Sequence, residues 1–276
     1  YEIDDDILGF GYKKDPRIDE IIKERNTLRQ DLSNIFECLL NQIALNKSEL
    51  NDDTIYYIGD LGIYSTNPLE IKLPQNIKGD LYLNGLISAE GLVLPKKIHG
   101  SLSLRDLTSA KGLVLPKSIG GYLYLHSLTS AEDLVLPKKI GGSLHLYSLK
   151  RTVHLVLPQN VGGDLNLNSL TSIEDLVLPQ NVGGDLNLNS LASAKGLILP
   201  KTIGGDLNLN SLTSVKSLEL PQNVGGDLVL TSLTTTEDLV LPQNVGGSLH
   251  LYSLKRIVRL VLPQNVGGSW VYLSNL

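Results

Sequence analysis

The chain has 276 residues, long enough to bury a large core, and it carries 24 basic and 29 acidic side chains for a net charge of −5. The net negative charge lies in segment 1–58, and the near-neutral remainder gives no reason to expect a nucleic-acid partner or an anionic membrane. The single cysteine, Cys38, excludes a disulfide framework and a cysteine-based metal cluster. The sequence contains no run of about 18 apolar residues, so it does not predict a transmembrane helix.

Residues 15–50 have the pattern of an α-helix. Asp15 has the side chain of an N-cap, and Pro16 suits the first helical position. We expect residues 1–58 to form a helical cap over the open apolar end of the next domain, with a coiled coil or a partner-docking helix as the alternative. The apolar residues recur at helical spacing in one stripe, at Ile18, Ile21, Ile22, Leu28, Leu32, Ile35, Phe36, Leu39 and Ile43.

From residue 59 onward the chain repeats a 21-residue unit. Numbered from its proline as position 0, each unit has Ile or Val at position 3, Gly at position 5, and Leu at positions 7, 9, 12, 18 and 20 with few exceptions. Self-similarity at a fixed period of this size predicts a solenoid, in which each coil buries its leucines against its neighbours. The prolines stand at 74, 95, 116, 137, 158, 179, 200, 221, 242 and 263.

Two L-x-L units per coil, at positions 7–9 and 18–20, indicate two short strands whose leucines face inward. Glycines at positions 4 and 5 would give one corner its backbone freedom, and the proline should end the second strand. The predicted fold is mainly β: a leucine-rich-repeat-like β-solenoid of about ten 21-residue coils over residues 59–276, with an N-terminal α-helical cap. GDLGIY at 59–64 would be an imperfect first coil, and Trp270 and Tyr272 would take leucine positions in the last.

The segment SLTSAEDLVLPKKIGG at 127–142 resembles the bacterial leucine-rich repeats of the BspA-like, or Treponema-type, class. The resemblance covers the chain from Asp60 to its end and rests on the SLTS and LxLP elements, including Leu134, Leu136 and Pro137. The Ala-Phe and Cys positions of the class are replaced by a second L-x-L, which favours a straighter two-sheet solenoid over a curved horseshoe. The resemblance implies a secreted or surface-displayed binding protein without enzymatic activity in its repeats.

No residue pattern predicts catalysis, a cofactor or a metal site. The repeated V-G-G-D lacks the Lys and Ser/Thr of a phosphate loop. His126 and His145 should face the same side of adjacent coils about 8 Å apart, without a third ligand, so solvated surface histidines are the better interpretation. One aspartate per coil at position 6 is fewer than calcium-binding turns use. We therefore expect a protein that is not an enzyme and needs no cofactor.

Positions 8 and 10 point outward from the first strand and vary between coils. Aromatic, imidazole and guanidinium side chains there favour docking of a partner, although ladders of Tyr and Asn also form through cross-strand stacking alone. Five lysines that follow the prolines of three early coils favour a neutral or acidic partner: Lys96, Lys97, Lys117, Lys138 and Lys139. The segment 141–153 recurs almost unchanged at 246–258, either as two patches for a bivalent partner or as a duplicated block. The predicted partner-binding residues are Tyr82, Arg105, Tyr124, His126, His145, Tyr147, His250 and Tyr252.

Position 19 should also face solvent, yet it is β-branched and apolar in eight of nine coils. Soluble monomers seldom expose so continuous an apolar stripe. We expect the N-terminal helix or a second subunit to cover it, although β-propensity would explain scattered valines. The predicted homo-oligomer interface is Val93, Val114, Val135, Val156, Val177 and Ile198.

The leading hypothesis is a non-catalytic recognition module that binds a protein partner, or else a glycan, through the outward face of the solenoid. The alternatives are a self-associating structural component of a surface or filament, and the repeat domain of a secreted bacterial effector. The residues do not indicate a compartment, and the resemblance alone favours secretion or the cell surface.

Overall fold

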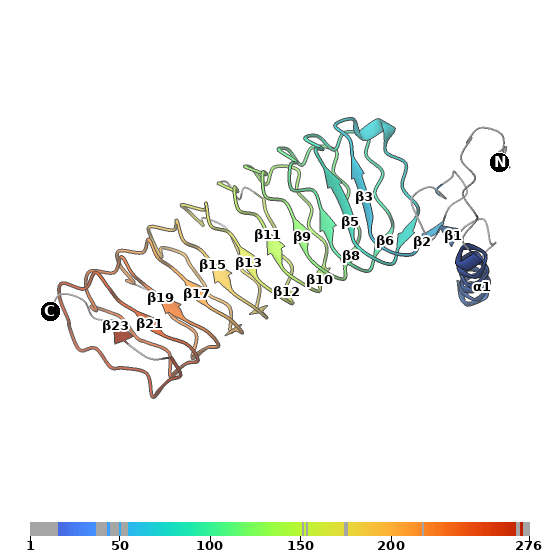
Figure 1. The fold of residues 1–276 in the computed structure, drawn as a ribbon. Helices are drawn as coiled ribbons and strands as arrows, with labels where there is room; N and C mark the ends of the chain where they lie inside the picture. Colours follow the sequence, from blue (N-terminus) through green and yellow to red (C-terminus); the bar gives the residue numbers. More distant parts are fainter. Residues whose placement is uncertain are drawn as a thin grey trace, which may run out of the picture.

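The computed structural model describes residues 16–36, 43, 44, 50, 55–150, 152, 154–173, 176–216, 218–268, 271 and 272. They form a parallel β-solenoid of about ten 21-residue turns, as predicted, with the helix α1 (Pro16–Phe36) at its N-terminal end (Figure 1). Figure 1 shows the coils stacked in a row along an elongated body, with β3 and β5 near one end and β23 near the other.

Two parallel sheets run along the solenoid, and each strand pairs with the equivalent strand one coil away, as Leu144 does with Leu165. The first sheet, sheet A, contains β1 (Ile43–Ala44), β2 (Tyr56–Tyr57), β4 (Asn76–Ile77), β6 (Lys97–Ile98), β8 (Ser118–Ile119), β10 (Lys139–Ile140), β12 (Asn160–Val161), β14 (Asn181–Val182), β16 (Thr202–Ile203), β18 (Asn223–Val224), β20 (Asn244–Val245) and β22 (Asn265–Val266). The second, sheet B, contains β3 (Leu61–Tyr64), β5 (Leu81–Asn84), β7 (Leu102–Ser103), β9 (Leu123–Tyr124), β11 (Leu144–His145), β13 (Leu165–Asn166), β15 (Leu186–Asn187), β17 (Leu207–Asn208), β19 (Leu228–Val229), β21 (Leu249–His250) and β23 (Val271–Tyr272).

The second strand of each coil does not lie where the leucines predicted it. Sheet B uses the predicted unit beginning at position 7, but sheet A is made by positions 2 and 3, directly after the proline. The ladder resumes at the first residue that can donate again: the Lys96 N–H donates to the Gln75 carbonyl at 2.8 Å. The L-x-L unit at positions 18–20 belongs to neither sheet in the described coils. The proline therefore precedes the second strand rather than ending it.

The leucines do form the core that the repeat predicted. Those at positions 7, 9 and 12 are fully buried, as in Leu165, Leu167 and Leu170. Val161 faces them from sheet A, and Leu155 closes the third side of the coil. Because each leucine is covered by its equivalents in the neighbouring coils, stability comes from stacking rather than from any single coil.

The two sheets meet at the glycine corner, where from Gly120 onward close approach rather than left-handed backbone geometry favours glycine at position 4. A Cβ atom on Gly183 would collide with the backbone carbonyl of Gly162 in the preceding coil, and the other described glycines at position 4 are equally confined. The next residue keeps the ladder intact, since the Gly184 N–H donates to the Gly163 carbonyl at 2.9 Å. The described glycines with positive φ lie elsewhere.

In most coils the side chain at position 6 joins one coil to the next. The Oδ1 atom of Asp164 accepts the Asp185 N–H at 2.9 Å, and the Oδ1 atom of Asp185 accepts the Asp206 N–H at 2.8 Å. Ser143 uses its hydroxyl in the same way, toward the Asp164 N–H at 2.8 Å. Asp and Ser recur here because an acceptor on a short side chain satisfies this N–H.

The N-terminal segment differs from the prediction in two respects. The helix ends at Phe36, and Ile43 lies in β1, paired with Tyr56, so sheet A already begins in this segment. Three residues of the predicted apolar stripe, Ile21, Ile22 and Leu28, are 47–60% exposed instead of being buried against the solenoid. Asp15, Cys38 and Leu39 lie outside the described residues. No described helix combines the length and apolar character needed to cross a membrane.

The last coil is shifted by one residue from the predicted register. Val271, not Trp270, stands opposite Leu249, and Tyr272 stands opposite His250.

Candidate functional site

Five rings gather on the outward face of sheet B, and we call them the ring cluster: Tyr122, Tyr124, His126, His145 and Tyr147. Strand β9 and the residues beside it carry the first three, and β11 and the residues beside it in the next coil carry the other two. Their neighbours in sequence, the leucines of the same strands, face the core and are fully buried. The rings are therefore held on one side of a rigid base.

The rings of adjacent coils stack face to face. Tyr124 and His145 are 4.9 Å apart between ring centroids with an interplanar angle of 4°, and His126 and Tyr147 are 4.6 Å apart at 27°. The two histidines stack on each other at 5.7 Å, which joins the pairs into one cluster. Tyr122 meets Tyr124 edge to face, at 5.8 Å and 62°. Such contacts stabilise by about 0.5–1.5 kcal/mol each beyond the area they bury.

The expectation of solvated histidines is wrong for His126 and His145, which are half-buried. The Nδ1 atoms of both rings are buried and have no hydrogen-bond partner among the described residues. Desolvation by burial lowers the pKa of both imidazoles, aided at His126 by Arg105 and at His145 by His126, and opposed by Asp106 and Asp164 respectively. The cluster is therefore uncharged at neutral pH, with two polar atoms left unsatisfied.

Two of the other predicted residues lie on coils that precede the cluster. The Tyr82 hydroxyl donates to Asp80 Oδ2 at 2.7 Å, and this hydrogen bond is the main cause that raises the pKa of Tyr82 to about 12. Arg105 lies one coil from His126, with its side chain 62% exposed and its Nε atom 3.9 Å from Asp106. Arg105 thus borders the cluster, while Tyr82 is engaged by its own coil.

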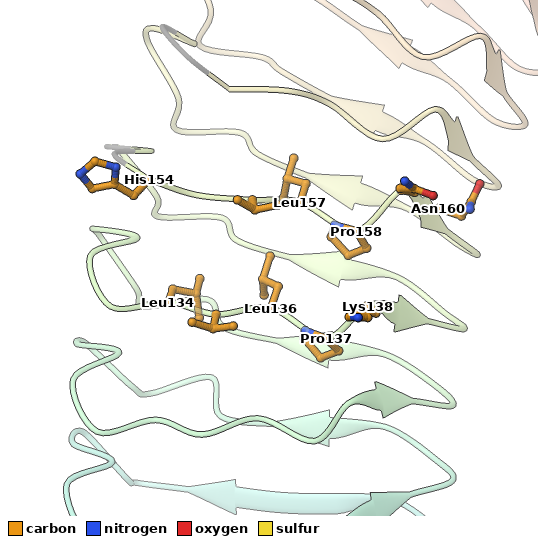
Figure 2. Close-up of a pocket in the computed structure, with 11 residues that line it drawn as sticks. Leu134, Leu136, Pro137, Lys138, His154, Leu157, Pro158 and Asn160 are labelled. Carbon is orange, nitrogen blue, oxygen red and sulfur yellow. The ribbon is translucent and has the colours of Figure 1, made fainter.

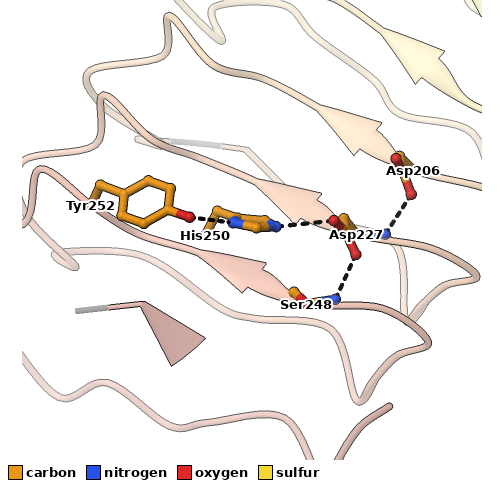
Figure 3. A network of polar contacts seen from close by, with 5 residues as sticks. All are labelled: Asp206, Asp227, Ser248, His250 and Tyr252. Carbon is orange, nitrogen blue, oxygen red and sulfur yellow. Dashed lines mark hydrogen bonds and ion pairs between the residues drawn. The ribbon is translucent and has the colours of Figure 1, made fainter. Parts of the chain in front are cut away.

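His250 and Tyr252 form a separate arrangement five coils further on, about 24 Å away at the usual strand spacing. His250 Nε2 lies 3.0 Å from Asp227 Oδ2, and its Nδ1 lies 2.9 Å from the Tyr252 hydroxyl (Figure 3). The Ser248 N–H donates to Asp227 Oδ1 at 2.6 Å, and this bond is the main cause that lowers the pKa of Asp227. The sequence Ser-Leu-His-Leu-Tyr occurs twice. At 143–147 its rings stack on those of the preceding coil, whereas at 248–252 its histidine binds an aspartate, because the preceding coil has a different sequence.

Sequence reasoning missed Tyr122, which the structure places in the cluster. A signal was present: position 6 is elsewhere Asp or Ser, whose oxygen accepts the next coil's N–H, and Tyr122 has no such short acceptor. A residue that breaks a local structural rule marks a candidate functional position. The middle coils instead carry asparagine ladders at position 10, with Asn189 Nδ2 donating to Asn168 Oδ1 at 3.0 Å.

The geometry of the described residues does not form a metal centre, since no three of their His, Cys, Asp and Glu side chains are placed to share an ion. No family model, curated protein or solved structure matches the chain. The resemblance to BspA-like repeats therefore stays a prediction, and the candidate site is defined by its own geometry.

We expect the free energy of unfolding to fall as the pH is lowered from about 7.5 to about 5.5. The pKa of His126 and of His145 is lowered in the folded chain, so the unfolded chain binds protons first as the pH falls through about 6.5. The contribution of the two neutral rings to the free energy of unfolding is complete above that pH and is lost as the pH falls below it. Urea unfolding at both pH values measures the loss.

The control is the variant His126→Asn plus His145→Asn, which keeps the remaining histidines and uses the residue found at these positions in the middle coils. Its unfolding free energy should fall less between the two pH values. An equal loss in both chains would contradict the assignment of neutral, desolvated rings.

Proposed function

We propose that the chain is a non-catalytic recognition module that binds a protein partner through the ring cluster and the adjoining Arg105. The observation that carries this proposal is the stack of five rings on an otherwise regular scaffold, with two histidine nitrogens that lack hydrogen bonds. Buried polar atoms without partners cost about 1–3 kcal/mol each. The cluster is therefore poorly explained by stability of the free chain alone.

The orientation of the rings favours a protein over a glycan. Sugars pack on open ring faces, whereas the faces of Tyr124, His126 and His145 are largely covered by one another. The cluster presents ring edges and polar tips, together with the exposed guanidinium of Arg105. Tyr and Arg are the side chains that dominate binding energy at the centre of protein interfaces.

The test uses a phage-displayed peptide library selected on the immobilised chain. In the asparagine variant, Tyr124, His126, His145 and Tyr147 are all replaced by Asn, the residue that the chain itself carries at 187, 189, 208 and 210. We expect this variant to stay folded, by circular dichroism, and to bind the selected peptides at least about 100-fold more weakly, as expected when central interface residues are lost.

The matched control alters the second copy of the motif, with His250→Val and Tyr252→Thr, the residues found one coil earlier. This control should keep the affinity of the parent chain. Peptides that bind the asparagine variant as tightly as the parent would refute the site. A chain that selects no peptide but binds a glycan array would refute the protein class of partner.

A further inference from the structure

A row of apolar side chains stands on the side of the solenoid that belongs to neither sheet. We call it the valine column, and its members are 75–82% exposed. The N-terminal helix does not cover it in the structure, contrary to one expectation. The column consists of Val93, Val114, Val135, Val156, Val177 and Ile198.

Strand pairing does not explain the column. Position 19 lies outside the ladders of both sheets, so the cross-strand packing that favours β-branched residues does not operate there. The fold also accepts charge at this position, because Lys72 and Glu219 occupy it in the flanking coils and both are exposed. The six apolar residues are therefore not required by the coil itself.

The exposed area and the surface shape of the valine column fit an interface with a second solenoid. Six side chains of this exposure present on the order of 700 Å², close to the roughly 800 Å² that each partner buries in a standard interface. Between the coils of Val135 and Val156 runs a groove of about 590 Å³, with leucines and prolines along it (Figure 2). A second groove, with more polar side chains along it, lies between Val177 and Ile198. A second copy has the same repeat distance, so each of its coils can lie opposite one coil of this face.

The charges at the two ends of the valine column favour an antiparallel pair of chains over a parallel one. Lys72 precedes the first valine by one coil, and Glu219 follows Ile198 by one coil. A two-fold axis between Val135 and Val156 pairs Val93 with Ile198 of the second copy and brings Lys72 of each copy to Glu219 of the other. A parallel pair in the same register would place lysine on lysine and glutamate on glutamate.

We propose that the valine column is the interface of an antiparallel dimer of this chain, closed at both ends by Lys72–Glu219 pairs. Such an interface is isologous, so that the same patch serves both copies. It lies away from the ring cluster of sheet B, and the dimer would carry two ring clusters. It does not depend on the proposed function.

The test is the mass of the full chain in solution, measured by sedimentation equilibrium over a range of concentrations. We expect a dimer, and we expect Val135→Lys plus Val156→Lys to raise its dissociation constant at least about 100-fold, because four lysines then meet around the two-fold axis. Val240→Lys plus Val261→Lys is the matched control. These valines also stand at position 19, beyond Glu219, and are equally exposed. The dissociation constant of the dimer should therefore be unchanged.

A charge exchange tests the arrangement itself. Glu219→Lys alone should weaken the dimer about tenfold, and adding Lys72→Glu should restore it. A parent chain that is monomeric at about 100 μM would overturn the proposal, as would a dimer insensitive to the Val135 and Val156 substitutions. A dimer that the charge exchange fails to rescue would overturn the antiparallel arrangement.

Discussion

Replacing Gly183 by alanine is expected to lower the free energy of unfolding by about 3 kcal/mol or more, the upper end of what overpacking produces. The new Cβ atom would collide with the Gly162 carbonyl, which belongs to backbone that pairs with the same coil and cannot rotate away as a side chain would. Relief requires the two coils to separate at the corner, which weakens both sheets at once. Chemical denaturation followed by circular dichroism measures the change.

The control is Gly62→Ala, since a Cβ atom at Gly62 meets nothing within 4 Å. Gly62 lies in β3 and pairs with Tyr82, so this control also adds a methyl group within a sheet. Its effect should stay within about 0.5 kcal/mol, as for ordinary surface changes. Equal effects of the two substitutions would show that close approach does not explain the glycine corner.

Replacing Leu188 by alanine is expected to lower the free energy of unfolding by about 3–4 kcal/mol. Leu188 is fully buried, and the strand register places it between Leu167 and Leu209 of the neighbouring coils. A cavity there removes contacts on both sides, and the stacked backbone prevents the coils from closing over it.

The control for this core substitution is Leu69→Ala, the same chemical change at a side chain that is 75% exposed. Leu69 lies in the short 3₁₀-helix Pro68–Glu70, and its loss should leave stability almost unchanged. If Leu188→Ala were as mild as Leu69→Ala, stability would not come from the leucine columns.

The regular part of the molecule could be predicted because each of its residues follows from one local property of the coil, such as its length or the burial of its inward side chains. The constant 21-residue spacing of the prolines set the coil length, and the inward leucines at positions 7, 9 and 12 are buried as expected. The second strand was misplaced because alternating leucines report burial and not hydrogen bonding. Leu134 is buried and Leu136 partly buried at the core, but neither lies in a ladder.

The candidate site could be predicted only in part, because its geometry depends on residues that lie one full repeat apart in sequence. Tyr124, His126, His145 and Tyr147 were recognised as outward residues, but their stacking is set by which ring follows which from coil to coil. The motif at 143–147 and 248–252 is an example, because the rings of the first copy stack on the preceding coil while the histidine of the identical second copy binds Asp227. The pair of adjacent coils, rather than the single repeat, is the unit in which function has to be sought.

A transplant of the ring cluster along the solenoid separates the contribution of the rings to binding from that of the coils. Starting from the asparagine variant, six residues three coils further on are replaced by the arginine and the five rings of the original site, in the same order. Peptide affinity is then measured by titration calorimetry. The substitutions are Asn168→Arg, Asp185→Tyr, Asn187→Tyr, Asn189→His, Asn208→His and Asn210→Tyr.

We expect the transplanted chain to regain the affinity of the parent to within about tenfold, since the ring cluster and its arginine carry the binding and the coils only hold them in place. A transplanted chain that folds as well as the parent and still does not bind the selected peptides would show that the rings and the arginine do not carry the binding.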